Sequence, residues 1–140
     1  MMLEARPREI VRITVDGNVL DVETARTPED RERGLKYRSS LCDTCGMLFV
    51  YPTEDRRAFY MHDVFIALDI AYFGADGRLQ EVRTLAAITE DTDAGDEAAP
   101  KTFPASIPFQ YALAVPAGWF ASHAIRRYAK LGLPHALPAL

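Results

Sequence analysis

Residues 46–77 read GMLFVYPTEDRRAFYMHDVFIALDIAYFGADG, and this stretch decides the fold. It consists of apolar runs separated by short polar breaks, a pattern that is typical of consecutive β-strands. Gly74-Ala75-Asp76-Gly77 predicts a hairpin turn, because glycine accepts the backbone angles that tight turns need. From this stretch we expect strands at Met47–Val50, Ala58–Met61, Asp69–Phe73 and Arg78–Ile88.

The sequence on either side adds further strands and two helices. Asp16-Gly17-Asn18 separates two alternating, β-branched runs, which predicts a hairpin. Thr27 is a suitable helix N-cap and Pro28 a suitable first residue, so a helix of about two turns is expected to begin there. The remaining expected elements are strands at Ile10–Val15, Val19–Thr24 and Gln110–Val115, and a helix over Trp119–Leu131.

Many short strands with turn signals favour a mainly β fold, either an antiparallel sandwich-like domain or a flattened barrel, with one or two short helices. A Rossmann-type sheet is disfavoured, since strands and helices do not alternate along the chain. The 140 residues are expected to form one domain. We expect an N-terminal tail at 1–9, a β domain over 10–132 with an exposed acidic loop at about 89–108, and a loose C-terminal tail at 133–140.

The composition is that of an ordinary globular protein, with 49% hydrophobic and 26% charged residues. The formal net charge of −4 argues against an electrostatic nucleic-acid binder, which normally presents a basic surface. No apolar window is long enough to span a membrane, and the N-terminus lacks the apolar core of a signal peptide. We therefore expect a soluble protein, while its compartment and its oligomeric state stay open.

Four blocks of the sequence carry a recognisable pattern: TPEDRERGLKYRSSL (Thr27–Leu41), GMLFVY (Gly46–Tyr51), FYMHDVFIALDIAYFGADGRL (Phe59–Leu79) and YALAVPAG (Tyr111–Gly118). In order and spacing they resemble the domain-of-unknown-function family 192 of bacteria and archaea. The resemblance implies a mainly β, sandwich-like domain with short helices and no assigned activity. It also suggests exported relatives, because many members carry a signal or anchor segment before the domain.

Asp69 lies inside the apolar run ALDIAYF at residues 67–73. An ionised carboxylate in an apolar core is costly, so Asp69 is expected to be paired or to lie at the edge of the core. Arg33 and Arg38, in and just after the first helix, are the candidate partners for a structural ion pair. The alternative interpretation is an acid with a perturbed pKa in a ligand cleft.

Cys42 and Cys45 form a C-x-x-C pattern and are the only two cysteines of the chain. A structural zinc site takes four ligands, so this pair would need further donors, for example His62. A redox pair is another alternative, although redox motifs usually open a helix and Gly46 leads into a strand. A disulfide that closes a small loop, or two unused thiols, is the favoured interpretation, and we assign no cofactor.

These patterns favour a binding module over an enzyme. No nucleotide-binding, metalloprotease or nucleophile-elbow motif is present, and an acid–base role of His62 with Asp63 or Asp69 is the least supported alternative. We expect a cleft that holds a small molecule, a glycan or a protein ligand. Two further alternatives are a metal-binding or thiol-redox protein and an interaction domain for a partner protein. The predicted ligand-binding residues are Arg38, Tyr60, His62, Asp63 and Asp69.

Overall fold

The computed structural model describes residues 8–60, 64–87, 102–104 and 107–140. The strands within these residues are β1 (Ile10–Val15), β2 (Asn18–Ala25), β3 (Cys45–Asp55), β4 (Ala58–Tyr60), β5 (Leu68–Phe73), β6 (Leu79–Leu85), β7 (Thr102–Pro104), β8 (Phe109–Pro116) and β9 (Leu131–Gly132), and the helices are α1 (Pro28–Arg33) and α3 (Trp119–Ser122). Seven of these strands form one sheet, in the order β6-β5-β8-β3-β2-β1-β9, and β4 pairs with β7 separately.

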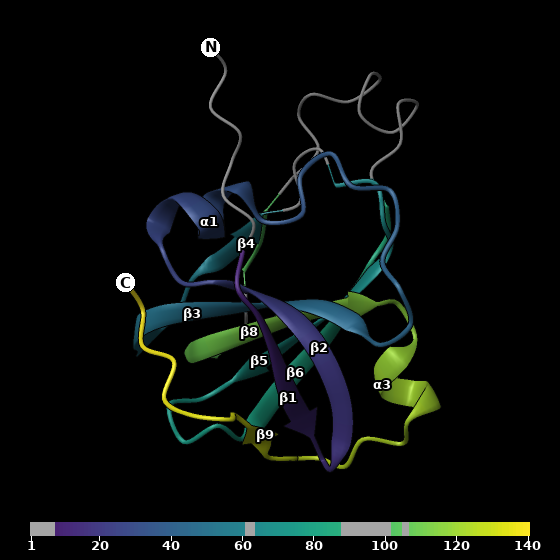
Figure 1. Ribbon diagram of the computed structural model, residues 1–140. Helices are drawn as coiled ribbons and strands as arrows, with labels where there is room; N and C mark the ends of the chain where they lie inside the picture. Colours follow the sequence, from purple (N-terminus) through teal and green to yellow (C-terminus); the bar gives the residue numbers. More distant parts are fainter. Residues whose placement is uncertain (1–7, 61–63, 88–101, 105–106) are drawn as a thin grey trace.

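The large sheet curls into a half-barrel (Figure 1), which confirms the predicted mainly β fold with short helices. Its two outer strands, β6 and β9, are brought together at one end. Arg78, just before β6, and Lys130, just before β9, form an isolated antiparallel bridge. The N–H of Leu131 donates to the carbonyl of Gly77 over 2.8 Å. The sheet is therefore partly closed at this end, and the bridge protects the edges of both outer strands there.

β1 and β2 form the predicted hairpin, in which Val15 pairs with Asn18 across the turn. The two turn residues, Asp16 and Gly17, have φ angles of 50° and 81°. Such positive values are the geometry that two-residue hairpin turns require. The sequence pattern at this position therefore predicted the turn and the hairpin, and the register of the two strands follows from the two-residue turn.

The connection from β2 to β3 is a parallel crossover that contains α1, so the sheet is mixed and not purely antiparallel as expected. The helix begins as predicted: Thr27 Oγ1 accepts the N–H of Asp30 over 3.1 Å, and Pro28 is the first helical residue. The six residues of α1 bury no side chain. Because a helix of this kind has no amphipathic period, the sequence did not reveal the strand–helix–strand unit.

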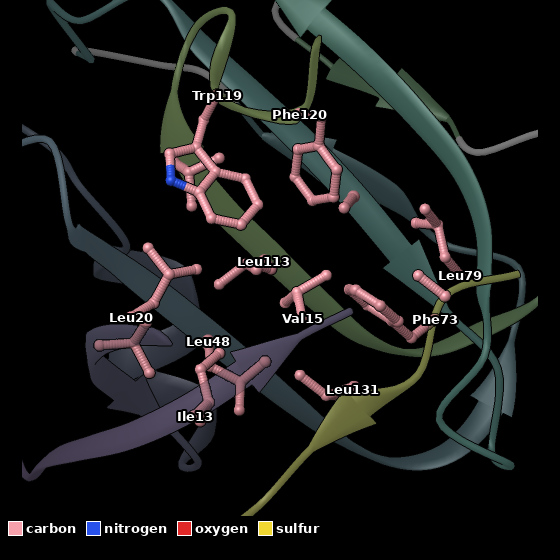
Figure 2. Close-up of a cluster of buried hydrophobic side chains, with 14 of the residues drawn as sticks. Ile13, Val15, Leu20, Leu48, Phe73, Leu79, Leu113, Trp119, Phe120 and Leu131 are labelled. Carbon is pink, nitrogen blue, oxygen red and sulfur yellow. The ribbon is translucent and has the colours of Figure 1, made fainter. Parts of the chain in front are cut away.

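Hydrophobic side chains alternate between two clusters, one on each face of the sheet. On β5, Phe73 belongs to the first cluster and Tyr72 to the second. All residues of β5 are buried, which explains its nearly uninterrupted apolar sequence. Figure 2 shows the first cluster, to which α3 contributes Trp119 and Phe120. Each side chain of this size stabilises the fold by about 1.5–3 kcal/mol when it is fully buried.

The helix predicted over Trp119–Leu131 is wrong beyond its first turn. α3 has four residues, and after it Ala124 and Tyr128 adopt φ angles of 49° and 61°, which no right-handed helix contains. Leu131 then pairs with Val15 of β1 and is 4% exposed. The tertiary contacts that bury Leu131 at the sheet edge prevail over the helical spacing of the sequence.

Residues 133–140, which were expected to be loose, pack against the domain. Leu137 is 3% exposed within the first cluster. The N–H of Leu140 donates to the carbonyl of Arg26 over 2.7 Å, and Arg26 Nε donates to the carbonyl of Pro138 over 2.8 Å. The end of the chain is thus fixed to the domain by the burial of Leu137 and by the hydrogen bonds of Pro138 and Leu140 with Arg26.

Most of the predicted acidic loop at 89–108 lies outside the described residues, apart from residues 102–104 and 107–108. Residues 102–104 form β7, which pairs with β4. β3 is longer than predicted and continues through Pro52, with a register shift between Val50 and Asp55. A proline is tolerated there because the ladder of hydrogen bonds is already irregular.

Candidate ligand-binding site

Asp69 lies near the start of β5 and is 3% exposed. Thr84 of β6 donates its hydroxyl to Asp69 Oδ1 over 2.7 Å. The backbone N–H groups of Gly118 and Phe120, at the start of α3, donate to Oδ2 over 3.1 and 3.3 Å. Hydrogen bonds from these three donors compensate the buried carboxylate, and among the described residues no cationic side chain pairs with it. Asp69 therefore fixes the start of α3 against the sheet.

The predicted ion pair of Asp69 with Arg33 or Arg38 is wrong. Arg38 Nη2 lies 2.6 Å from Oε1 of Glu23 on β2. Arg33 Nη2 lies 3.3 Å from Oδ1 of Asp30 within α1. The sequence indicates that a buried acid needs partners, but two of the partners of Asp69 are backbone N–H groups. Because every residue except proline has such a group, the sequence gives no signal of which ones will bind the acid.

Arg38 belongs to a half-buried charged cluster on the β2 and α1 side of the domain. The side chain of Arg8 is 3% exposed and lies 3.6 Å from Glu23 and 3.7 Å from Asp30, measured between nitrogen and oxygen atoms. Burial lowers the pKa of Arg8. Burial also opposes the ionised form of Glu23, but the hydrogen bond from Arg38 holds the pKa of Glu23 below its usual value. The guanidinium of Arg38 is thus engaged by a structural partner.

Three other predicted ligand-binding residues contribute no described side chain. His62 and Asp63 lie outside the described residues, and Tyr60 is described through its backbone, which pairs with Thr102. The N–H of Phe65 donates to the carbonyl of Arg38 over 3.1 Å. The chain that follows Asp63 therefore runs beside the segment that contains Arg38. The binding roles of Tyr60, His62 and Asp63 stay predictions.

A cleft of about 460 Å³ opens beside the segment that Asp69 holds in place. Gly118 connects the two features, because its N–H donates to Asp69 and the residue itself lines the cleft. Its φ of 91° favours glycine at this position. The volume falls in the range of small-molecule sites in proteins. The lining residues are Asp43, Thr44, Pro116, Ala117, Gly118, Trp119, Ser122 and His123.

His123 is the most distinctive side chain of this cleft. From the sequence it was placed in the helix expected over Trp119–Leu131 and considered as a further donor for a metal at the C-x-x-C pair, but not as a ligand-binding residue. Its ring stacks on that of Trp119, with centroids 4.3 Å apart and planes 24° from parallel. His123 Nδ1 lies 2.8 Å from the carbonyl oxygen of Trp119. A carbonyl oxygen only accepts hydrogen bonds, so Nδ1 carries the proton and Nε2 is the accepting nitrogen of the neutral ring. The hydroxyl of Ser122 lies 3.1 Å from Nδ1.

Cys42 and Cys45 form a disulfide, which was one of the favoured interpretations of the C-x-x-C pattern. The two residues between them, Asp43 and Thr44, supply one wall of the cleft. A disulfide sulfur is not a thiolate, so this pair could hold a metal only after reduction. Among the described residues no group of three metal-ligating side chains is present, and His62 lies outside them.

The fold and the site together define a half-barrel β domain with a small cleft beside a short, capped helix. Within this class the chain belongs to the DUF192 family, described as uncharacterized ACR, whose model matches residues 11–133. The match covers nearly the whole chain and confirms the family suggested by the four sequence blocks. The family description names no activity.

Two solved structures are similar to this chain. One is a proposed transcription regulator from Sinorhizobium meliloti 1021, with 22% identity and a TM-score of 0.77 over 93% of this chain and 98% of that chain. The other is a protein of unknown function from Novosphingobium aromaticivorans DSM 12444, with 28% identity and a TM-score of 0.71 over 91% of this chain and 92% of that chain. No curated protein matches the chain. None of the helices in the described residues is long and apolar enough to cross a membrane.

Proposed function

We propose that this protein is a binding module that holds a small, hydroxyl-rich ligand in the cleft between Asp43 and His123. The observation that carries the proposal is the cleft itself, whose volume of about 460 Å³ suits a small molecule or a short glycan. Its wall at α3 is held by the buried hydrogen bonds of Asp69, so the wall is ordered before a ligand arrives. Such pre-organisation lowers the entropic cost of binding.

The chemistry of the lining residues narrows the class of ligand. The stacked His123 ring offers a flat surface for a sugar or an aromatic ring. Thr44 and Ser122 offer hydroxyl groups that donate and accept hydrogen bonds. Among the described residues that line the cleft, Asp43 is the only charged group if the histidine is neutral, and none is a lysine or an arginine. A neutral or cationic ligand is therefore favoured over an anionic one.

An NMR titration with neutral mono- and oligosaccharides and polar fragments tests this proposal. Binding is expected to shift the amide signals of Thr44, Ala117 and Gly118 and the indole signal of Trp119. His123→Ala is expected to weaken binding by about tenfold or more. His135→Ala is the matched control, because His135 is also exposed and also places Nδ1 near a backbone carbonyl, but does not line the cleft.

Two results of this titration, and one result with protein ligands, would contradict the proposal. One is the absence of any saturable shift at this cleft with the whole ligand set. Another is an equal loss of binding in the two histidine variants. The third is binding of a protein ligand alone, which would favour the interaction-domain alternative. The description of one structural relative as a proposed transcription regulator does not carry over at 22% identity, which shows the fold alone.

A thiol–disulfide role is the second candidate function, because Cys42 is exposed beside this cleft and is oxidised. Equilibration with glutathione buffers, followed by alkylation of free thiols, measures the reduction potential of the pair. A value well above roughly −300 mV favours a reactive pair, whereas a lower value indicates a structural disulfide. Cys45 begins β3 and not a helix, so no helix N-terminus stabilises a thiolate at this pair.

A further inference from the structure

A second cleft, of about 530 Å³, lies at the end of the half-barrel where the edges of the sheet meet. It is bordered by the β1–β2 turn, the start of β6 and residues 126–132, and it shares no lining residue with the cleft beside α3. Figure 1 shows β9 beside the tip of β1 at this end. The N–H of Asp16 donates to the carbonyl of Lys130 over 3.3 Å, and the N–H of Leu79 donates to Ala129 over 2.9 Å. Backbone hydrogen bonds thus hold the cleft walls together.

The described residues that line this second cleft include four cationic side chains and one acidic side chain, although the whole chain has a net charge of −4. The acid, Asp16, is already compensated by Arg126, whose Nε lies 3.0 Å from both carboxylate oxygens. The backbone N–H of Arg126 also donates to Asp16, over 3.1 Å. The acid of this cleft is therefore satisfied within the protein and does not offset the other cations.

The three remaining cationic side chains are those of Arg78, Arg127 and Lys130. Lys130 donates to the backbone carbonyl of Asp76, which is a neutral acceptor. The carboxylate of Asp76 accepts the backbone N–H of Arg78 over 2.9 Å. In the part of the chain that the structure describes, no ion pair joins the guanidinium of Arg78 or of Arg127 to a carboxylate. A local excess of positive charge thus lies at this cleft of a protein whose net charge is negative.

The backbone of this cleft is also unusual. Tyr128 is 51% exposed and has a φ of 61°, which is a strained value for an aromatic residue. The guanidinium of Arg127 lies 5.0 Å from the centroid of its ring. Gly132 has no room for a side chain, because a Cβ would lie 2.2 Å from Thr14 Oγ1. Strained residues that the surrounding structure maintains tend to mark ligand sites.

From these observations we propose that the second cleft binds a small molecule that carries a phosphate group. Guanidinium groups such as those of Arg78 and Arg127 match two phosphate oxygens with paired N–H donors, and the ammonium of Lys130 adds a third charge. The exposed ring of Tyr128 offers a surface for a planar group attached to the phosphate. This site goes beyond the proposed neutral-ligand cleft and does not depend on it.

Titration of the full chain with inorganic pyrophosphate tests this proposal, at constant ionic strength and with amide shifts as the readout. Saturable shifts are expected at Gly17, Tyr128 and Gly132, and not at Gly118 in the other cleft. The double variant R78Q/R127Q is expected to raise the dissociation constant by about tenfold or more. The control R12Q/R56Q removes the same charge from exposed positions outside the cleft and is expected to change it by about twofold at most.

The alternatives are distinguished in the same experiment. Loss of binding in the control variant as large as in R78Q/R127Q would overturn the proposal, because it would indicate non-specific attraction. Absence of saturation at roughly 10 mM pyrophosphate would overturn it as well. A lipid headgroup presents the same phosphate chemistry, so sedimentation with vesicles of phosphatidic acid in phosphatidylcholine is measured in parallel. Sedimentation without pyrophosphate saturation would contradict a small-molecule site, whereas saturation without sedimentation supports it.

Discussion

Asp69 Oδ2 accepts the backbone N–H of Gly118 over 3.1 Å, and so a buried carboxylate of β5 caps α3, a helix 49 residues away in sequence. The N-cap of α3 is Gly118, which has no side chain that could cap the helix itself. Phe120 N–H donates to the same oxygen. The sheet thus supplies a cap that helices usually take from their own sequence. Because Gly118 also lines the cleft beside α3, this contact helps to fix the position of that cleft wall.

The loss of stability on replacing Asp69 should follow the number of hydrogen-bond acceptors that the new side chain keeps, and not the loss of a charge. Asp69→Ala leaves the hydroxyl of Thr84 and two backbone N–H groups without their acceptor, and it should destabilise the protein by about 3 kcal/mol or more. Asp69→Asn keeps one oxygen acceptor and should cost about 1–2 kcal/mol. Urea unfolding measures both values. Equal losses in the two variants would contradict this account of Asp69.

Removal of the disulfide should leave the fold intact. Cys42 and Cys45 are three residues apart and close a very short loop, so the double replacement by serine should lower the free energy of unfolding by about 2 kcal/mol. Thermal and urea unfolding of oxidised, reduced and double-serine protein measure the effect. In the double-serine variant, ligand binding at the cleft beside α3 should weaken more than binding at the second cleft. The reason is that Asp43 and Thr44, which line the cleft beside α3, lie within the loop that the disulfide closes. An unfolded double variant would contradict the prediction.

Metal content tests the remaining alternative for the two cysteines. Protein purified without a metal-affinity tag and under reducing conditions should contain less than stoichiometric metal, because the described residues offer no third ligand near the pair. Elemental mass spectrometry gives the ratio directly. A near-stoichiometric metal that disappears in Cys42→Ser would instead establish a metal site, and His62→Ala would then test the predicted third ligand.

The stability of the protein should depend on pH through Asp16. Its hydrogen bonds with the side chain and backbone of Arg126 lower the pKa of Asp16 from 3.8 to about 2. A group with a lowered native pKa stabilises the fold above its unfolded pKa, and this contribution is lost as the pH falls from about 4 towards 2. The difference in unfolding free energy between wild type and Asp16→Asn should therefore shrink over this range.

Arg126→Gln gives an independent check on the same pair. Because the hydrogen bonds from Arg126 lower the pKa of Asp16, the carboxyl group should titrate closer to its ordinary value of 3.8 in this variant. Carbon-detected NMR of the Asp16 carboxyl group measures this pKa in both proteins. An unchanged titration in Arg126→Gln would show that the pair does not form in solution.

Alanine substitutions at Gly46 and Gly74 should differ in cost, because a new Cβ would meet a fixed backbone atom at Gly46 and a flexible side chain at Gly74. A Cβ at Gly46 in β3 would lie 2.7 Å from the backbone oxygen of Ala114 in the neighbouring strand. Gly46→Ala should therefore cost about 1–3 kcal/mol, because the strands must move apart. A Cβ at Gly74 would meet Glu54 Oε1 at 2.8 Å, and this flexible side chain can turn away. Gly74→Ala should cost less, and the reverse order in thermal unfolding would contradict the packing described.

Much of the fold was predictable because its signals are local. The apolar run at residues 67–73 predicts a strand and the Asp16-Gly17-Asn18 turn predicts the first hairpin, and both are confirmed. Thr27 and Pro28 predict the start of α1, which is also confirmed. The helix expected over Trp119–Leu131 failed, because the spacing of its large side chains also suits a turn that delivers Leu131 to the sheet edge.

The candidate site was less predictable than the fold. The sequence alone indicated that Asp69 must be paired or lie at the edge of the core, since an apolar run surrounds its carboxylate. Only the tertiary structure decided that those partners are Thr84 and the backbone of α3, that His123 stacks on Trp119, and that distant cations share one cleft. The reason is physical: strand period, caps and turns depend on neighbouring residues, whereas backbone donors and converging side chains are brought together only by the curl of the sheet.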